Sequence, residues 1–154
     1  MANLNTRLES EGAEFLVLGT LLIEGIPAYK TYTNYPGYDV IAVNPASGKS
    51  CRIQVKCRWA TDFNRTFLIK NLACDFVVMV ALNRGYRYYK KARAKSSDDM
   101  GRRAPQMYVF PIRVVKKAVD PTSNWGRCSL GRIKNVENYI DDWEPIREFL
   151  GATS

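Results

Sequence analysis

Two short runs of strand-forming residues joined by a turn constrain the fold of this chain more than any other feature. The runs cover residues 38–43 and 50–58, and both are rich in β-branched and aromatic residues. The residues between them, 44–49, read Asn-Pro-Ala-Ser-Gly-Lys and are dense in turn formers. The pattern therefore predicts an antiparallel β-hairpin.

Three polar residues of this hairpin are expected to converge on one face. A symmetric turn places Asp39 opposite Gln54, and opposed residues of an antiparallel pair share a face, with Cβ atoms about 4.5–5.5 Å apart. Side chains alternate along a strand, so Lys56 lies on the same face as Gln54. Such a group can hold a hard cation against a phosphate. The opposite face of the second strand is core material and carries Cys51, Ile53, Val55 and Cys57.

A helix predicted over residues 4–24 carries a further acidic residue that faces inward. At about 100° per residue, Glu14 falls within the apolar stripe of this helix, which contains Val17, Leu18, Leu21 and Leu22. A carboxylate in such a stripe is costly unless it is paired, hydrogen-bonded or close to a metal. Two interpretations stay open. In the structural one, Glu14 reaches solvent from the edge of the stripe or forms a salt bridge to a buried Arg; in the functional one, it is a partner of the hairpin.

The rest of the sequence predicts an α/β chain. Strands are predicted over residues 28–33, 66–69, 74–82 and 107–112, a short helix over 114–118, a loop over 120–131 and a core-packing terminal helix over 136–150. The run over 74–82 is continuously apolar, as in a buried central strand, whereas Pro111 places the next strand near an edge. No repeat or linker divides the chain, so we expect a single domain over residues 1–154.

A segment of different character spans residues 84–103, where cations alternate with tyrosines. Its cations include Arg84, Arg87, Lys90, Lys91, Arg93 and Lys95. Cations that hold phosphates and rings that stack on bases suit a nucleic-acid surface, although a solvated edge hairpin has the same composition. The formal net charge of +8 favours an anionic partner, most often nucleic acid.

The cysteines and the hydropathy pattern indicate the compartment. The chain has four cysteines, no CxxC pair and no His, which argues against a zinc site and for reduced thiols in a cytoplasmic protein. The longest apolar run, residues 15–23, is too short to span a bilayer, and the acidic residues before it argue against a signal peptide. We therefore expect no membrane association.

The order of these features resembles the PD-(D/E)xK nuclease superfamily, which has the restriction-endonuclease-like fold. The matching residues are Glu14 in the helix, Asp39 before the hairpin, and Gln54 and Lys56 in the second strand. The resemblance covers residues 12–58 and includes the start Gly12-Ala13-Glu14, which is similar to that of small members. It implies a central mixed β-sheet flanked by an N-terminal and a C-terminal helix.

Two departures from the superfamily pattern concern the site itself. The proline that usually precedes the aspartate is displaced, because the order here is Pro36-Gly37-Tyr38-Asp39. The acidic residue two positions before the lysine is Gln54, which removes one negative charge. The resemblance implies a catalytic set of Glu14, Asp39, Gln54 and Lys56.

The resemblance further implies a Mg²⁺-dependent endonuclease acting on DNA, with Mn²⁺ as a substitute. The metal ligands would be Asp39, the Gln54 side-chain oxygen, the Val55 carbonyl and, through a water molecule, Glu14. Lys56 would orient the attacking water or neutralise developing charge. One site cuts one strand, so cutting both strands of a duplex or a branched DNA requires a homodimer or a higher even oligomer.

Two rival interpretations follow from the same residues. The first is a non-catalytic nucleic-acid-binding protein on this fold, in which the basic segment after Arg84 is the functional surface. The second is an unrelated basic α/β subunit, in which Glu14 would pair with an arginine and Asp39 would lie far from Gln54. These residues do not indicate which biological role the protein has among restriction, homing, resolution and repair.

Overall fold

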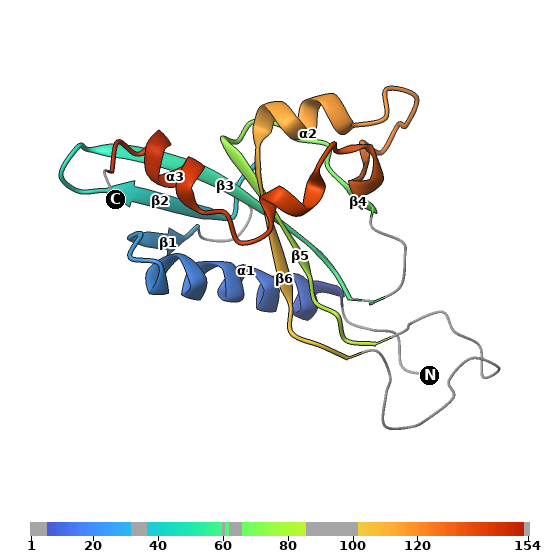
Figure 1. Cartoon of the computed structure of the whole chain (residues 1–154), viewed down its shortest axis with the longest axis horizontal. Coiled ribbons are helices and arrows are strands. Elements are labelled where there is room, and N and C mark those ends of the chain that lie inside the picture. The colour runs from blue at the N-terminus through green and yellow to red at the C-terminus, as the bar shows by residue number, and fades with distance from the viewer. Residues whose placement is uncertain (1–5, 32–36, 60, 62–65, 86–101, 153–154) are drawn as a thin grey trace.

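A mixed five-stranded sheet forms the centre of the structure (Figure 1). The computed structural model describes residues 6–31, 37–59, 61, 66–85 and 102–152. In spatial order, the strands are β1 (Ala28–Lys30), β2 (Val40–Asn44), β3 (Lys49–Arg58), β5 (Phe76–Ala81) and β6 (Gln106–Pro111). Strand β3 runs parallel to β5, and the other neighbouring pairs are antiparallel.

Two layers cover the sheet, one on each face. The helices are α1 (Thr6–Ile23), α2 (Ile112–Ala118) and α3 (Glu144–Phe149), with 3₁₀ turns η1 (Leu130–Arg132) and η2 (Val136–Tyr139). Helices α1 and α3 bury their apolar side chains with one face of the sheet. Helix α2 and a separate strand pair, β4 (Thr66–Leu68) and β7 (Arg127–Ser129), pack on the other face. The layered α/β architecture is the predicted one.

The central strand β5 explains why both faces need a cover. Five of its six residues are buried: Val78 and Val80 face the α1 layer, whereas Val77 and Met79 face the α2 layer. A strand that is apolar on both faces is stable only when helices or a second sheet cover both. Strand β6 occupies the sheet edge and ends at Pro111, as the sequence predicts.

The predicted hairpin is confirmed, including its register. Val43 lies opposite Ser50 and Ile41 opposite Arg52, so the alternation of side chains is the expected one. Cys51, Ile53 and Val55 are buried in the core beneath α1. The strand β2 begins at Val40, two residues later than predicted, because the ladder becomes irregular at Asp39.

Two predictions for the C-terminal third are wrong. The expected loop over residues 120–131 contains β7 and the start of η1. The expected helix over residues 136–150 is broken into η2 and α3, because Pro145 can occupy only the first turn of a helix. Before it, Asp141 takes a φ of 52° and donates its backbone N–H to the Met107 carbonyl at 2.8 Å. The apolar spacing that suggested one helix therefore comes from two short elements that pack on one core.

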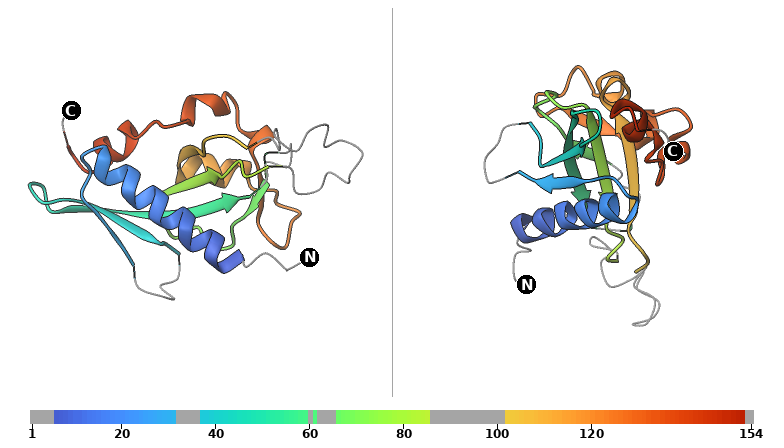
Figure 2. Two further views of the ribbon diagram at one scale, coloured as in Figure 1. Left: turned by 90° about the horizontal axis from the view of Figure 1, so that it is seen from below. Right: turned by 90° about the vertical axis from the view of Figure 1, so that its left-hand side faces the viewer.

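Helix α1 lies along the outside of the molecule, over the strands β1, β2 and β3. In the left view of Figure 2 it crosses in front of the strands, and no other described element lies over it. The helix ends where predicted, at Gly25, whose φ of 76° only glycine adopts readily. Within the described residues, no helix is both long and apolar enough to cross a membrane.

Candidate active site

Asp39 lies where the ladder between β2 and β3 ends. By the register of the hairpin it faces Gln54, yet its N–H donates to the carbonyl of Ile53 at 2.9 Å. The N–H of Val55 then donates to Oδ2 of Asp39 at 2.8 Å. The Asp39 carboxylate therefore takes the place of a backbone acceptor at the point where the two strands part.

The hydrogen bond between Val55 and Asp39 also indicates where the Val55 carbonyl oxygen points. In an antiparallel ladder, the N–H and the carbonyl of one residue point to the same side of the strand. Because the Val55 N–H points to Asp39, the Val55 carbonyl points to that side as well, beyond Val40, the first residue of β2. A carboxylate and a carbonyl oxygen thus border the same open corner of the sheet.

Glu14 approaches this corner from α1. Its side chain is 22% exposed, and its Oε2 lies 3.3 Å from Nζ of Lys30 in β1. Burial raises the pKa of Glu14, and the negative charge of Asp39 raises it further, whereas Lys30 lowers it. The charge of Asp39 thus reaches Glu14, while the direct contact of Glu14 is a salt bridge of the structural kind that the sequence left open, to a lysine instead of an arginine.

Asp39 and Lys56 are coupled in the same way. Burial raises the pKa of Asp39, while the Val55 N–H and the charges of Lys56 and Lys30 lower it. Burial lowers the pKa of Lys56, and the charge of Asp39 opposes that change. Partly buried ionisable groups whose charges influence one another are characteristic of functional sites.

Gln54 lies on β3, two residues before Lys56 and opposite Asp39 in the register of the hairpin. Its Oε1 accepts a contact of 3.9 Å from Sγ of Cys74, which is a weak donor. Burial raises the pKa of Cys74 to about 11, so this thiol carries no charge at neutral pH. The amide oxygen of Gln54 consequently keeps acceptor capacity on the face that it shares with Lys56.

The donor set fits a hard cation. Across the part of the chain that the structure describes, no group of three or more His, Cys, Asp or Glu side chains could hold a metal ion. The corner instead offers two carboxylates, one amide oxygen and one backbone carbonyl, all oxygen donors of the kind that Mg²⁺ and Mn²⁺ take. Because the negative charge of Asp39 disfavours ionisation of Glu14, a cation bound near both carboxylates would stabilise their charged forms.

Lys30 is the site residue that sequence reasoning missed. It bridges Glu14 and Glu11, with Nζ 3.2 Å from Oε1 of Glu11. Alternation along β1 puts Lys30 on the same face as buried Ala28, which is the face toward α1. That alternation was the available signal, because a lysine facing an inward glutamate is a natural partner for it.

A hollow of about 530 Å³ opens beside the site, between α1 and β1. Lys30 and Glu11 line it, together with Thr31, whose N–H donates to the Asp39 carbonyl at 3.0 Å. The hollow therefore adjoins the corner through Lys30 and Thr31, whereas Glu14, Asp39 and Lys56 are not among its lining residues.

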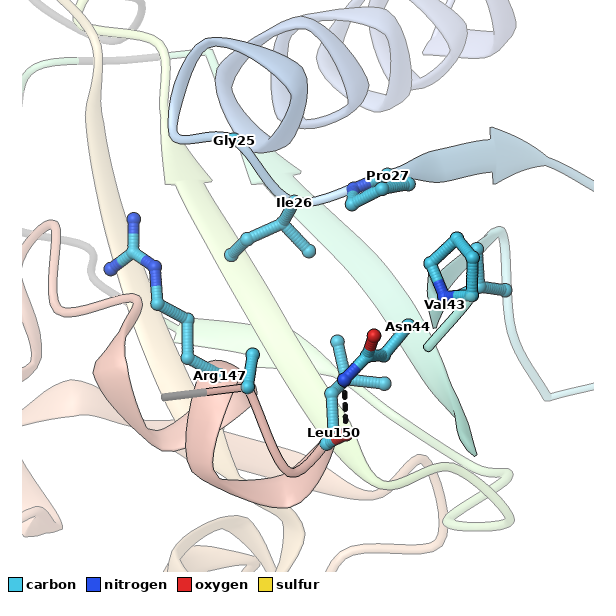
Figure 3. A pocket seen from close by; sticks show the side chains of 9 residues that line it. Gly25, Ile26, Pro27, Val43, Asn44, Arg147 and Leu150 are labelled. Carbon is cyan, nitrogen blue, oxygen red and sulfur yellow. Dashed lines mark hydrogen bonds between the residues drawn. The ribbon is translucent and has the colours of Figure 1, made fainter. Parts of the chain in front are cut away.

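A second hollow, of about 320 Å³, lies at the opposite end of the hairpin (Figure 3). There Nδ2 of Asn44 donates to the carbonyl of Leu150 at 3.0 Å. The charged group of this hollow, Arg147, is already paired with Glu24 and Glu144. We therefore assign no chemistry to it.

The predicted basic surface is described only at its start. Arg84 is exposed, and it forms an isolated bridge with Arg102 close to Trp59, whose carbonyl accepts the Arg84 N–H at 2.9 Å. The other predicted contacts, Arg87, Lys90, Lys91, Arg93 and Lys95, lie outside the described residues.

Comparison with known proteins supports the fold. No protein-family model matches the sequence, and no curated protein matches it significantly. Among solved structures, a bacterial homing endonuclease, I-Ssp6803I, aligns with a TM-score of 0.55 and 18% identity over 94% of this chain and 93% of its own. This chain has a restriction-endonuclease-like fold.

A second solved structure gives a weaker likeness. The Holliday junction resolvase Hjc of Archaeoglobus fulgidus aligns with a TM-score of 0.49 and 13% identity over 95% of this chain and 98% of its own. We base the fold assignment on the first structure. At such low identity the likeness concerns the path of the chain, and the chemistry has to be argued from the residues themselves.

Proposed function

We propose that this chain is a metal-dependent endonuclease that hydrolyses phosphodiester bonds of DNA. The observation that carries the proposal is the open corner of the hairpin, where Asp39 raises the pKa of Glu14 and is itself coupled to Lys56. Both carboxylates are only partly exposed, and the charge of Asp39 disfavours the ionised form of Glu14, which is a cost that a purely structural cluster has no need of. The nuclease names of the structures that share the fold agree with the proposal.

Four oxygen donors would hold the cation, Mg²⁺ or Mn²⁺, at this corner. Asp39 would be the main ligand, joined by the Gln54 side chain, the Val55 carbonyl and, from the helix side, Glu14. When bound, the cation supplies positive charge that polarises the phosphate and makes water more acidic. Because Gln54 is neutral, the two carboxylates carry all the negative charge of the site.

Lys56 would act on the reacting groups themselves. Lys56 is half-buried on the face of Asp39 and Gln54, and burial lowers its pKa from the ordinary value of a lysine. A cation fixed there can orient the attacking water and neutralise the charge that develops on the phosphate. Lys30 would hold Glu14 in place through the contact at 3.3 Å.

The partner would be DNA, double-stranded or branched, bound with the help of the basic segment that begins at Arg84. One such domain, residues 1–154, supplies one site and cuts one strand. We therefore include a homodimer, or a higher even oligomer, and a cytoplasmic location in the proposal.

A non-catalytic nucleic-acid-binding protein is the second candidate. The observation that favours it is Gln54, a neutral residue where the superfamily pattern has an acid. Glu14 and Lys56 speak against it, because a binding surface has no need of buried ionisable groups.

A cleavage assay separates the two. Plasmid and branched DNA would be incubated with Mg²⁺ or Mn²⁺ and three proteins: native, Lys56→Ala, and Lys49→Ala as a control. Lys49 is an exposed lysine of the same strand at its other end. We expect native and Lys49→Ala to cut, and Lys56→Ala to cut on the order of a hundredfold more slowly or worse.

Other outcomes would overturn the proposal. DNA binding without cleavage by the native chain in either metal would favour the non-catalytic protein. Normal cutting by Lys56→Ala would show that the site lies elsewhere.

A further inference from the structure

Trp125 lies outside the packed parts of the structure. It is 62% exposed, whereas Trp143 is 3% exposed and packs in the core beneath α1. Trp125 belongs to neither of the two core clusters that the described residues form. Because a tryptophan contributes most to stability when it is buried, one that the core does not use is suited to contact a ligand.

The ribbon formed by β4 and β7 fixes the position of this ring. Gly126 has a φ of 67°, and its carbonyl accepts the Ile69 N–H at 2.9 Å. A Cβ at position 126 would lie 1.9 Å from the Ile69 carbonyl oxygen, so only glycine lets the two strands come this close. Trp125 thereby lies beside Lys70, whose Nζ is 4.1 Å from the centre of the ring, a cation–π contact.

The outward face of this ribbon combines apolar and cationic side chains. Leu68 and Arg127 lie opposite each other in the ladder, and both are exposed, whereas Phe67 between them and the next pair is buried against the sheet. Continuation of the same register places Lys70 opposite Trp125 on the exposed side. One face therefore presents an aromatic ring, an aliphatic side chain and two cations.

The surroundings of the ribbon are basic. Strand β7 lies next to the end of α2, to which it is joined by a bridge between Val119 and Cys128. From β6 to η1, residues 106–132, the chain has one acidic residue, Asp120, against five basic ones, all exposed: Arg113, Lys116, Lys117, Arg127 and Arg132. Such a surface is complementary to a polyanion, and stacking on an exposed ring favours nucleic acid over an acidic protein.

The start of β4 is joined to the strand that carries the candidate active site. Arg58 is the last residue of β3 and, by alternation, shares its face with Gln54 and Lys56. Its guanidinium group donates to Oγ1 of Thr66, the first residue of β4, at 3.1 Å. The ribbon therefore adjoins the face of β3 on which the proposed catalytic lysine lies.

The chain beyond the end of β4 reaches the other side of the same site. Asn71 lies against Gly37, two residues before Asp39, since a Cβ added at Gly37 would be 3.1 Å from Nδ2 of Asn71. Helix α2 and β4 lie on the same side of the sheet, away from α1 (Figure 1). The segment from β4 to Asn71 thus extends from the end of β3 to the corner of Asp39.

We propose that the outward face of the β4–β7 ribbon binds an unpaired nucleotide of the DNA substrate, with its base stacked on Trp125 and the adjoining phosphates held by Lys70 and Arg127. The choice of DNA rests on the proposed function, and the inference specifies its form: a duplex that carries a single-stranded arm or branch.

The form of the DNA follows from the chemistry of the ring. A duplex offers base edges and phosphates to a protein, whereas an unpaired base offers its flat face. Lys70 occupies one face of the Trp125 ring and holds its orientation, so a base can stack on the other. Arg58 and the ribbon together form a basic path from this base to the candidate active site.

A DNA-binding titration with divalent metal chelated tests the inference without cleavage. A blunt duplex and the same duplex with a single-stranded arm would be titrated with native protein, Trp125→Leu and Trp125→Phe, which keeps a ring. We expect native protein to bind the armed duplex more tightly than the blunt one. Trp125→Leu should lose on the order of tenfold in affinity for the armed duplex and little for the blunt one, whereas Trp125→Phe should keep most of the affinity.

Leu22 gives a matched control on the other layer of the molecule. It is an apolar residue of α1 and is 52% exposed, so Leu22→Ala removes exposed apolar surface away from the ribbon. This variant should bind both DNAs as native protein does. Trp125→Leu should stay folded, because Trp125 is outside the core, and urea unfolding of each variant checks this.

Three results would overturn the inference: equal affinity of native protein for the two DNAs, a loss in Trp125→Leu that is the same for both, or a loss in Trp125→Phe as large as in Trp125→Leu. The expected binding pattern without any cleavage after addition of Mg²⁺ or Mn²⁺ would leave the inference intact while ending the proposed function. Cleavage by native protein, with unchanged binding of the armed duplex by Trp125→Leu, would do the reverse.

Discussion

The two ends of the β2–β3 hairpin use polar residues in different ways. At the turn, the register runs without interruption to the pair Asn44 and Lys49. Nδ2 of Asn44 and Oγ of Ser47 both donate to the Leu150 carbonyl, at 3.0 and 2.9 Å. Neutral side chains there satisfy backbone groups and join the hairpin to the C-terminal helix.

At the open end of the hairpin, the polar side chains are ionisable and partly buried. The Asp39 carboxylate replaces a backbone acceptor. Burial raises the pKa of Asp39 and lowers the pKa of Lys56, which favours the uncharged form of each. The two ends therefore differ in their energetics. Neutral hydrogen bonds at the turn stabilise the fold, whereas the partial burial of charged groups at the open end reduces stability, as is typical of functional sites.

Replacement of Asp39 should have the largest effect. Asp39→Ala removes the main proposed ligand, so cleavage should fall on the order of a thousandfold or more, while DNA binding, which depends on exposed cations, remains. Plasmid cleavage and a DNA-binding titration would be measured on the same preparation. Normal cutting by this variant would show that the open end of the hairpin is not the active site.

Replacement of Asn44 tests the other end. Asn44→Ala loses the bond from Nδ2 to the Leu150 carbonyl and the bond from the Ala46 N–H to Oδ1. Ser47 still satisfies the Leu150 carbonyl, so the free energy of unfolding should fall by about 1–2 kcal/mol. Urea unfolding measures this change. Cleavage per folded molecule should stay at the native rate, and a large loss would mean that the two ends are not independent.

The smallest expected effect concerns pH. The pKa of Glu14 is raised in the folded state, so the native chain binds more protons than the unfolded chain just above pH 4.5. The free energy of unfolding, measured without metal, should therefore fall as the pH rises above about 4.5. It should level off once Glu14 is ionised in both the folded and the unfolded state. Glu14→Gln should lack this part of the decrease, because glutamine does not titrate. Lys30 would still be paired with Glu11 in this variant. Urea unfolding from pH 4 to 7 checks it, and identical pH profiles would contradict the assignment.

The hairpin could be predicted because two local signals agree. The alternation over residues 50–58 fixes the buried face, and the turn residues fix the register that sets Asp39 opposite Gln54. The open end could not be predicted in detail. Its irregular ladder depends on the hydrogen bond from the Val55 backbone N–H to the Asp39 side chain, which no propensity records.

Other features depended on contacts between distant residues. The terminal helix was mispredicted because apolar spacing outweighed Pro145, which limits α3 to residues 144–149. Lys30 was missed because its importance appears only when β1 lies beside α1 and two glutamates.

Cation binding is the most direct test of the central claim, which is that the open end of the hairpin is a metal site. A Mn²⁺ titration without DNA would compare native protein with Asp39→Asn, which keeps the shape and an acceptor for the Val55 N–H but loses the charge. We predict that native protein binds Mn²⁺ and that the variant binds it at least about tenfold more weakly. Equal binding by the two proteins would contradict the account.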